Sequence, residues 1–169
     1  MKNFAIAFIF VLLGSFFFTA CGPSKDDAIK YNDTLISLQE LIVEKDDVFL
    51  NSQGNADSLK MAHTELLNQV NATIKATEKI GAFDDYNDFH KACLEFLGNY
   101  KGVVEKEYTI LMSVVSKPDS LISLEDNELY DSAYDVSIDK IEMAAARLNT
   151  AQEEFAKKFN FKIAKKPLE

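Results

Sequence analysis

Apolar side chains recur at alternating spacings of three and four residues through four long segments, and this repeat constrains the fold more than any other feature. Such spacing lines up the apolar side chains on one face of an α-helix. The sustained alternation that is typical of strands is nearly absent, and the three Pro and six Gly lie mostly between the segments. The sequence therefore predicts an all-α protein.

The first two segments are separated by a turn-rich cluster at 51–55. The first covers about 24–50, and Lys45 occupies the one step of its stripe that lacks an apolar residue. The second ends at Gly81, which is a helix stop signal. The first stripe is Ala28, Tyr31, Leu35, Leu38, Ile42 and Phe49; the second is Leu59, Ala62, Leu66, Val70 and Ile80, with Thr73 and Thr77 on the same face.

The third segment has the most aromatic face and ends at Lys117–Pro118. Asp84 or Asp85 is its expected N-cap. Gly98 and Gly102 within it each cost about 1 kcal/mol relative to Ala, which suggests a kink or a close helix approach. Its stripe is Tyr86, Phe89, Cys93, Phe96, Tyr100, Val103, Ile110 and Val114.

The fourth segment covers about 125–159, and lysines 157, 158, 165 and 166 suit its C-terminal dipole end. Its stripe is Leu129, Val136, Ile141, Ala144, Ala145, Leu148, Phe155 and Phe159. Four helices with short connections predict an antiparallel up-down four-helix bundle, roughly 40 to 50 Å long.

The N-terminal residues form a secretion signal that ends at a cysteine. Lys2 gives a positive start, residues 4–18 form an apolar region, and Thr19-Ala20 supply small residues for cleavage. A retained membrane span is the alternative, but the stretch is slightly shorter than the roughly 20 apolar residues that a bilayer requires.

Phe18-Thr19-Ala20-Cys21 resembles a bacterial lipobox, with Phe18 where Leu is usual. The resemblance implies a diacylglycerol thioether on Cys21 and cleavage before it, after which the protein carries palmitate-like acyl chains. Cleavage by an ordinary signal peptidase would instead leave Cys21 as a free thiol, which suits an oxidising compartment poorly. We expect a signal peptide at 1–20, a lipidated tether at 21–27 and a bundle domain at 28–169.

The formal net charge of −9 argues against nucleic acid as a partner and against electrostatic attraction to anionic lipid. Gly22, where enteric inner-membrane lipoproteins carry Asp, favours the outer membrane. Lys25-Asp26-Asp27 resembles the surface-export tags of Bacteroidetes lipoproteins. The same residues also suit a helix start capped by Ser24, with two carboxylates at the positive dipole end. The expected location is therefore the cell envelope, on the periplasmic or the surface face.

Two further patterns are candidate sites. The tripeptide Tyr31-Asn32-Asp33 recurs as Tyr86-Asn87-Asp88, so a duplicated helical hairpin would place both at one end as a polar and aromatic binding patch. Asn and Asp are favoured at helix starts, so chance recurrence explains the repeated tripeptide equally well.

Four Asp-Ser/Thr-apolar triplets resemble Bacteroidetes O-glycosylation acceptors, although Asp and Ser also favour helix starts. Their hydroxyl residues are Thr34, Ser58, Ser120 and Ser132.

Catalytic and metal-binding signatures are missing from the sequence. Neither His63 nor His90 follows a Glu by three residues, as a di-metal bundle site requires. Cys93 has no disulfide partner if Cys21 is lipidated, and is interpreted as a small buried side chain. No cofactor, metal or enzymatic activity is predicted.

The chain resembles the small, acidic, all-helical lipoproteins of Bacteroidetes-like bacteria. The resemblance implies a non-enzymatic envelope module that binds another envelope protein or a glycan. The alternative function is binding of a small apolar ligand or haem within the helical bundle. Enzymatic activity is the third function considered.

Overall fold

The computed structural model describes residues 22–52 and 54–163, and within these ranges the chain is helical with no strand. The elements are α1 (Lys25–Asn51), α2 (Ala56–Ile80), α3 (Asp88–Glu105), α4 (Glu107–Val115), the 3₁₀ turn η1 (Asp119–Leu121) and α5 (Leu124–Lys158). The predicted all-helical fold is confirmed. None of the helices in this part of the chain combines the length and the apolar character needed to cross a bilayer.

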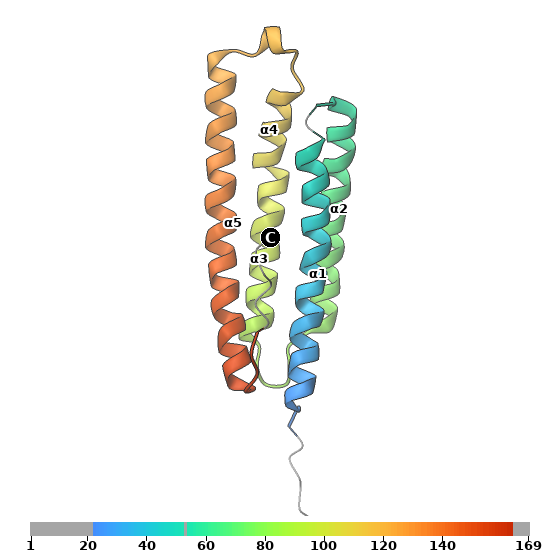
Figure 1. Cartoon of the computed structure of the whole chain (residues 1–169), viewed down its shortest axis with the longest axis vertical. Helices are drawn as coiled ribbons and strands as arrows, with labels where there is room; N and C mark the ends of the chain where they lie inside the picture. Colours follow the sequence, from blue (N-terminus) through green and yellow to red (C-terminus); the bar gives the residue numbers. More distant parts are fainter. Residues whose placement is uncertain (1–21, 53, 164–169) are drawn as a thin grey trace, which may run out of the picture.

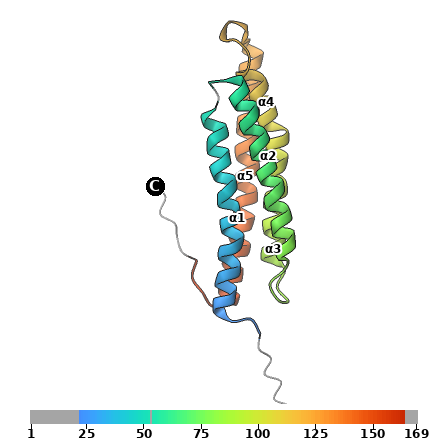
Figure 2. The same ribbon diagram turned by 90° about the vertical axis from the view of Figure 1, so that its right-hand side faces the viewer.

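Helices α3 and α4 follow one another in a single interrupted rod, so four long rods lie side by side (Figure 1). Helix α2 packs between α1 and α3, and α5 packs on α3 and α4. Helices α1 and α5 contact each other much less. Figure 2 gives the same rods in side view, with the η1 end of α4 and α5 extending past the loop between α1 and α2.

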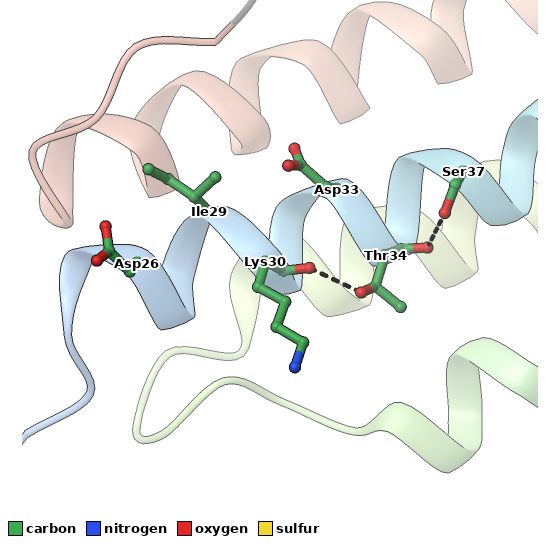
Figure 3. Close-up of a pocket in the computed structure, with 6 residues that line it drawn as sticks. All are labelled: Asp26, Ile29, Lys30, Asp33, Thr34 and Ser37. Atoms are coloured by element: carbon green, nitrogen blue, oxygen red, sulfur yellow. Dashed lines mark hydrogen bonds between the residues drawn. The ribbon is translucent and has the colours of Figure 1, made fainter.

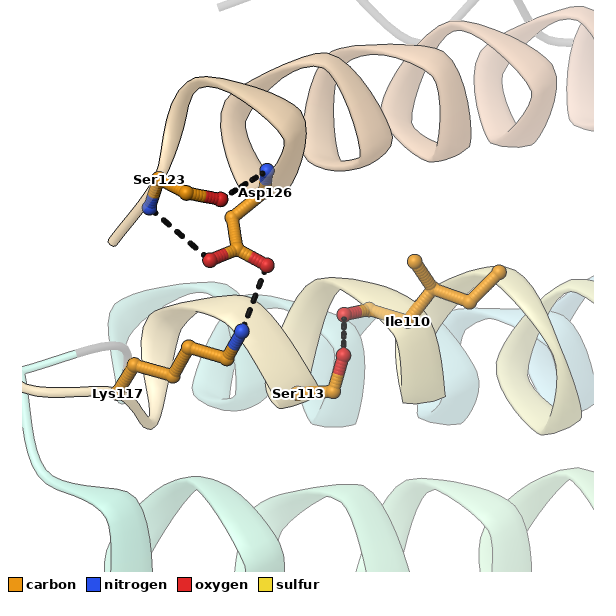
Figure 4. Close-up of polar contacts among 5 residues, drawn as sticks. All are labelled: Ile110, Ser113, Lys117, Ser123 and Asp126. Carbon is orange, nitrogen blue, oxygen red and sulfur yellow. Dashed lines mark hydrogen bonds and ion pairs between the residues drawn. The ribbon is translucent and has the colours of Figure 1, made fainter. Parts of the chain in front are cut away.

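Capping boxes start both α1 and α5. The Ser24 hydroxyl accepts a hydrogen bond from the Asp27 N–H at 3.1 Å, and the Asp27 carboxylate accepts from the Ser24 N–H at 3.0 Å. Ser123 and Asp126 repeat the arrangement at 3.1 and 3.0 Å (Figure 4). These reciprocal bonds satisfy N–H groups that a helix start leaves without partners. The expected N-cap at Ser24 is confirmed.

Helix α2 begins at Asn55, whose side chain accepts a hydrogen bond from the Ser58 N–H, and ends at Gly81 with a φ of 73°. A positive φ favours glycine because it has no Cβ. The predicted boundaries of this helix are therefore confirmed.

The carboxylate of Asp126 also binds the Lys117 ammonium at 2.6 Å, which joins the end of α4 to the start of α5 (Figure 4). The Lys117 ammonium and the Ser123 N–H lower the pKa of Asp126 from 3.8 to about 2. A carboxyl whose pKa is lower in the folded state stabilises the protein above its unfolded pKa, and this contribution disappears as the pH falls through the folded value.

We therefore expect Asp126→Asn to lower the melting temperature at pH 7, with the difference from wild type shrinking between about pH 4 and pH 2. Thermal unfolding followed by circular dichroism across this range measures the effect. Asp131→Asn, at an exposed position of the same helix, is the matched control and should leave the melting temperature unchanged. A constant difference between Asp126→Asn and wild type down to pH 2 would contradict the assignment.

The start of α3 differs from the prediction. Asp84 lies in a turn with a φ of 53°, and α3 begins only at Asp88, after Asn87. The Tyr86 N–H donates to the Phe83 carbonyl at 3.0 Å, which closes this turn and orients both rings toward the C-terminal part of α5. The expected cap at Asp84 or Asp85 was wrong because aromatic packing, which a capping rule does not consider, fixes this loop.

The third rod is interrupted at Lys106, whose φ of −112° and ψ of −68° depart from helical values. Gly98 and Gly102 are exposed, and a Cβ on either would meet no atom within 4 Å, so the expected close approach does not occur. Directly after the break, Glu107 is only 2% exposed, and its Oε1 binds the Lys140 ammonium of α5 at 2.9 Å. This half-buried ion pair, in which the Lys140 side chain is 40% exposed, links α4 to α5.

The core has two clusters of buried side chains. One surrounds Phe49, Leu66 and Val104; the other surrounds Phe89 and Phe155, where α1 and α3 begin and α5 ends. Two residues of the predicted fourth stripe, Leu129 and Val136, are 46% and 39% exposed, so the predicted stripe was wrong there. The inward positions in this part of α5 are Tyr130, Ala133, Ser137 and Ile141.

Candidate functional site

A cavity of about 230 Å³ lies where α1 and α5 diverge over α4. Three helices supply its lining: Asp46 and Leu50 from α1, Tyr108 and Leu111 from α4, and Tyr130, Tyr134, Ser137, Ile138, Ile141 and Glu142 from α5. Small-molecule sites in proteins are concave and largely apolar, with a few convergent polar groups. This cavity has that composition, and we treat it as the candidate functional site.

Asp46 is the most unusual group in the cavity because its carboxyl is partly buried among tyrosines. Burial raises its pKa above 3.8, an effect that the neighbouring hydroxyls of Tyr100 and Tyr108 partly offset. Asp46 Oδ1 and the Tyr100 hydroxyl are buried beside each other, but no well-aligned hydrogen bond joins them. Buried polar atoms without well-aligned partners are rare and costly, so the cluster invites an additional hydrogen-bonding or charged group.

Tyrosine rings form much of the wall. The Tyr130 and Tyr134 rings, one helical turn apart on α5, are parallel with centroids 6.4 Å apart. Tyr108 stacks on Phe49 with centroids 4.8 Å apart. The Ser137 hydroxyl donates to the Tyr134 carbonyl at 2.6 Å and so points back along its own helix. The cavity therefore offers aromatic rings and two carboxyl groups, those of Asp46 and Glu142, rather than a network of hydrogen-bond donors.

Tyr31 and Tyr86, of the predicted binding patch, both reach the same end of the bundle. Each ring lies 5.6 Å from the ring of Phe155. The Tyr31 hydroxyl donates to the Gly81 carbonyl at 2.7 Å, and burial raises its pKa. Both tyrosines are packed in the aromatic cluster instead of lining an open site.

The four polar residues of the predicted patch are not gathered together. Asn32 is buried and accepts a hydrogen bond from Gln152 at 2.8 Å. Asn87 precedes α3 without a side-chain capping bond, and Asp33 and Asp88 are exposed. The structure brings the two tyrosines to one cluster but does not build a polar patch from the six residues.

Lys25, Asp26 and Asp27 are exposed in the first turn of α1, and the hydrogen bond from the Ser24 hydroxyl lowers the pKa of Asp27. Asp26 also lines a broad surface depression with Ile29, Lys30, Asp33, Thr34 and Ser37 (Figure 3). All six residues come from α1, so no second element converges with them on a ligand. Cys21, the predicted lipidation site, lies outside the described residues.

The four candidate glycosylation residues differ in accessibility. Thr34, Ser120 and Ser132 are exposed, whereas Ser58 is half-buried in the first turn of α2. The Thr34 hydroxyl donates to the Lys30 carbonyl at 2.7 Å within α1. Ser120 lies in η1, at the end of the bundle opposite the start of α1 (Figure 1).

The cysteine and the histidines have structural environments. Cys93 is fully buried, and burial raises its pKa to about 12, so the predicted buried position is confirmed. His63 Nε2 forms a hydrogen bond with the Val104 carbonyl at 2.8 Å, and His90 Nε2 forms one with the Thr77 carbonyl at 2.8 Å. Across 22–52 and 54–163, no three His, Cys, Asp or Glu side chains come together as a metal site would need.

Sequence reasoning missed the cavity, although a signal was present. Tyr130, Tyr134, Ile138 and Ile141 repeat at helical spacing, and Asp46 follows Ile42 by four residues on the buried stripe of α1. A carboxylate on a core stripe, opposite a tyrosine pair, would have singled out this region. The prediction had placed Lys45 at that step, but Lys45 turns outward and binds Glu65 at 2.7 Å.

Comparisons with models of known protein families, with curated proteins and with solved structures each returned no match.

Proposed function

We propose that this protein is a non-enzymatic, lipid-anchored binding module of the bacterial cell envelope. Its antiparallel up-down bundle takes a small, partly apolar organic molecule between α1 and α5. The lipid on Cys21 holds the bundle at the outer membrane, and Lys25, Asp26 and Asp27 direct it to the surface face.

The observation that carries the ligand proposal is the cavity at Asp46. It combines apolar and aromatic walls with the carboxyl groups of Asp46 and Glu142. Its volume of about 230 Å³ is below that of drug-sized sites, and its lining has no His, Cys or Met, the commoner ligands of haem iron. A small organic molecule therefore fits this site better than haem.

A second candidate function is docking of an envelope protein or glycan at the η1 end. Leu121 and Leu124 there are 67% and 75% exposed, an unusual density of apolar surface for a helix start. Capture of a partner through this end in crosslinked cells, from protein whose cavity is empty, would favour this candidate.

Native mass spectrometry of the full chain, released from membranes in mild detergent, tests the ligand proposal. We expect a bound small molecule in wild type and its loss in Ile138→Trp, because the larger side chain fills the cavity mouth. Met143→Trp, at a 59% exposed position of α5 outside the cavity, is the matched control and should keep the ligand. Wild-type protein that carries no adduct and binds no apolar dye saturably would refute the proposal.

A further inference from the structure

The charges around the cavity have one sign. Asp46 and Glu142 line it, and no Lys, Arg or His is among its lining residues. The formal net charge of the whole chain, −9, adds to the negative potential. A ligand that brings a positive charge would be complementary to this site, whereas an anion would be repelled from it.

The aromatic walls favour the same charge. Tyr108, Tyr130 and Tyr134 line the cavity, so three of the six tyrosines of the chain border it. The face of an aromatic ring carries partial negative charge and attracts cations within about 6 Å of its centre. Several such faces beside a carboxylate form a site typical of organic ammonium recognition.

The buried oxygens at Asp46 supply an independent argument. Asp46 Oδ1 is buried beside the hydroxyls of Tyr100 and Tyr108, without a well-aligned hydrogen bond to either. A buried carboxylate is poorly solvated, and a cation placed against it compensates the lost solvation. Because the Asp46 carboxyl also lines the cavity, an ammonium in the cavity would supply that compensation.

Resting on the proposed function, we infer that the ligand is a small organic ammonium, a free amine or quaternary ammonium on a short apolar body. The ammonium contacts the Asp46 carboxylate and the tyrosine faces, and the apolar body contacts Ile138 and Ile141. The cavity volume of about 230 Å³ is below that of drug-sized sites, which begin near 300 Å³, so the body is short.

The binding should depend on pH through Asp46. The groups that face it are Asp47 on its own helix, Tyr100 on α3, Tyr108 on α4, and Glu142 and Tyr134 across the cavity on α5. Burial raises the pKa of Tyr100 and Tyr108, so both hydroxyls stay neutral while Asp46 titrates. Affinity for a cation should fall as acidification protonates Asp46, and affinity for a neutral molecule should not.

Calorimetric titration of the full chain with choline and with its uncharged isostere 3,3-dimethylbutan-1-ol tests the inference. We expect saturable binding of choline, about tenfold or more tighter than that of the isostere, and weakening of that binding on acidification. Equal binding of both compounds would overturn the ammonium inference while leaving the proposed small-ligand function intact. Saturable binding of neither at millimolar concentration would overturn the inference, and the adduct measurement would then decide the function separately.

Variants separate recognition from folding. Asp46→Asn should abolish the preference for choline and raise the melting temperature at pH 7, because the charged form of this carboxyl is disfavoured by burial. Glu44→Gln removes one charge from an exposed position of α1 and should change neither property.

Tyr130→Leu should weaken the affinity for choline about tenfold without changing the affinity for the isostere. Unchanged choline affinity in Asp46→Asn, or binding only to phosphatidylcholine vesicles and not to free choline, would overturn the inference.

Discussion

Replacing Phe155 with Ala is expected to lower the free energy of unfolding by about 3 to 5 kcal/mol. Phe155 is fully buried, and its ring lies 4.8 to 5.8 Å from six other rings. These belong to Tyr31, Phe83, Tyr86, Phe89, Phe159 and Phe161. One side chain therefore joins α1, the loop between α2 and α3, α3 itself and the segment after α5.

The size of this loss follows from the cavity that the truncation leaves. The neighbouring rings come from four parts of the chain and cannot all move inward together, so the space would remain largely unfilled. Because small domains are stable by only about 5 to 15 kcal/mol, the variant should lose about a fifth or more of its stability.

Urea unfolding followed by far-ultraviolet circular dichroism measures the difference for Phe155→Ala. Met143→Ala, at a 59% exposed position on the same helix, should stay within about 0.5 kcal/mol of wild type. A loss below about 1 kcal/mol for Phe155→Ala would show that the aromatic cluster does not hold these segments together.

The second large effect concerns location in the cell. Cys21→Ala should remove the proposed lipid, so that the share of the chain that an ordinary signal peptidase cleaves after Ala20 moves from the membrane fraction to the soluble fraction. Two or more acyl chains, at ~0.8 kcal/mol per buried methylene, hold a protein on a membrane almost permanently. The acidic chain, with a net charge of −9, has no electrostatic attraction to anionic lipid that could replace them.

Fractionation of cells that express each variant, together with intact-mass measurement of the membrane form, tests this prediction. Cys93→Ala removes the other cysteine, which is fully buried, and should remain in the membrane fraction. A wild-type membrane form whose intact mass includes residues 1–20 and no acyl chains would support a retained span instead of a lipid anchor.

The helix boundaries were largely predictable because local chemistry determines them. Ser24 with Asp27, and Gly81 with its positive φ, act within one helical turn, so neighbouring residues contain the information. The break at Lys106 and the late start of α3 depend on Glu107 meeting Lys140 and on Tyr86 meeting Phe155, which are distant in sequence. Periodicity alone does not reveal such pairs.

The candidate site was less predictable for a related reason. Tyr31 and Tyr86 were predicted to belong to a binding patch because each begins a Tyr-Asn-Asp tripeptide, but their rings pack on the ring of Phe155. Asp46 and Tyr134 carry no local motif, and they become a site only because α1 and α5 diverge over α4. The apolar stripe predicted from the sequence included Leu129 as an inward residue, although the neighbouring Tyr130 is the more buried of the two.

Under the proposed lipid anchor, the start of α1 at the Ser24 capping box would set the height of the cavity above the membrane. Only residues 22–24 separate the proposed lipidated cysteine from α1, so the helix starts within about 15 Å of the lipid, even in an extended chain. Asp46 is about six helical turns further along, which places the cavity roughly 30 Å from the anchored end at 1.5 Å per residue. If the long axis of the bundle is perpendicular to the membrane, the proposed site would lie beyond the lipid headgroups. It would then be accessible to dissolved molecules, near the end of the bundle that is farther from the membrane.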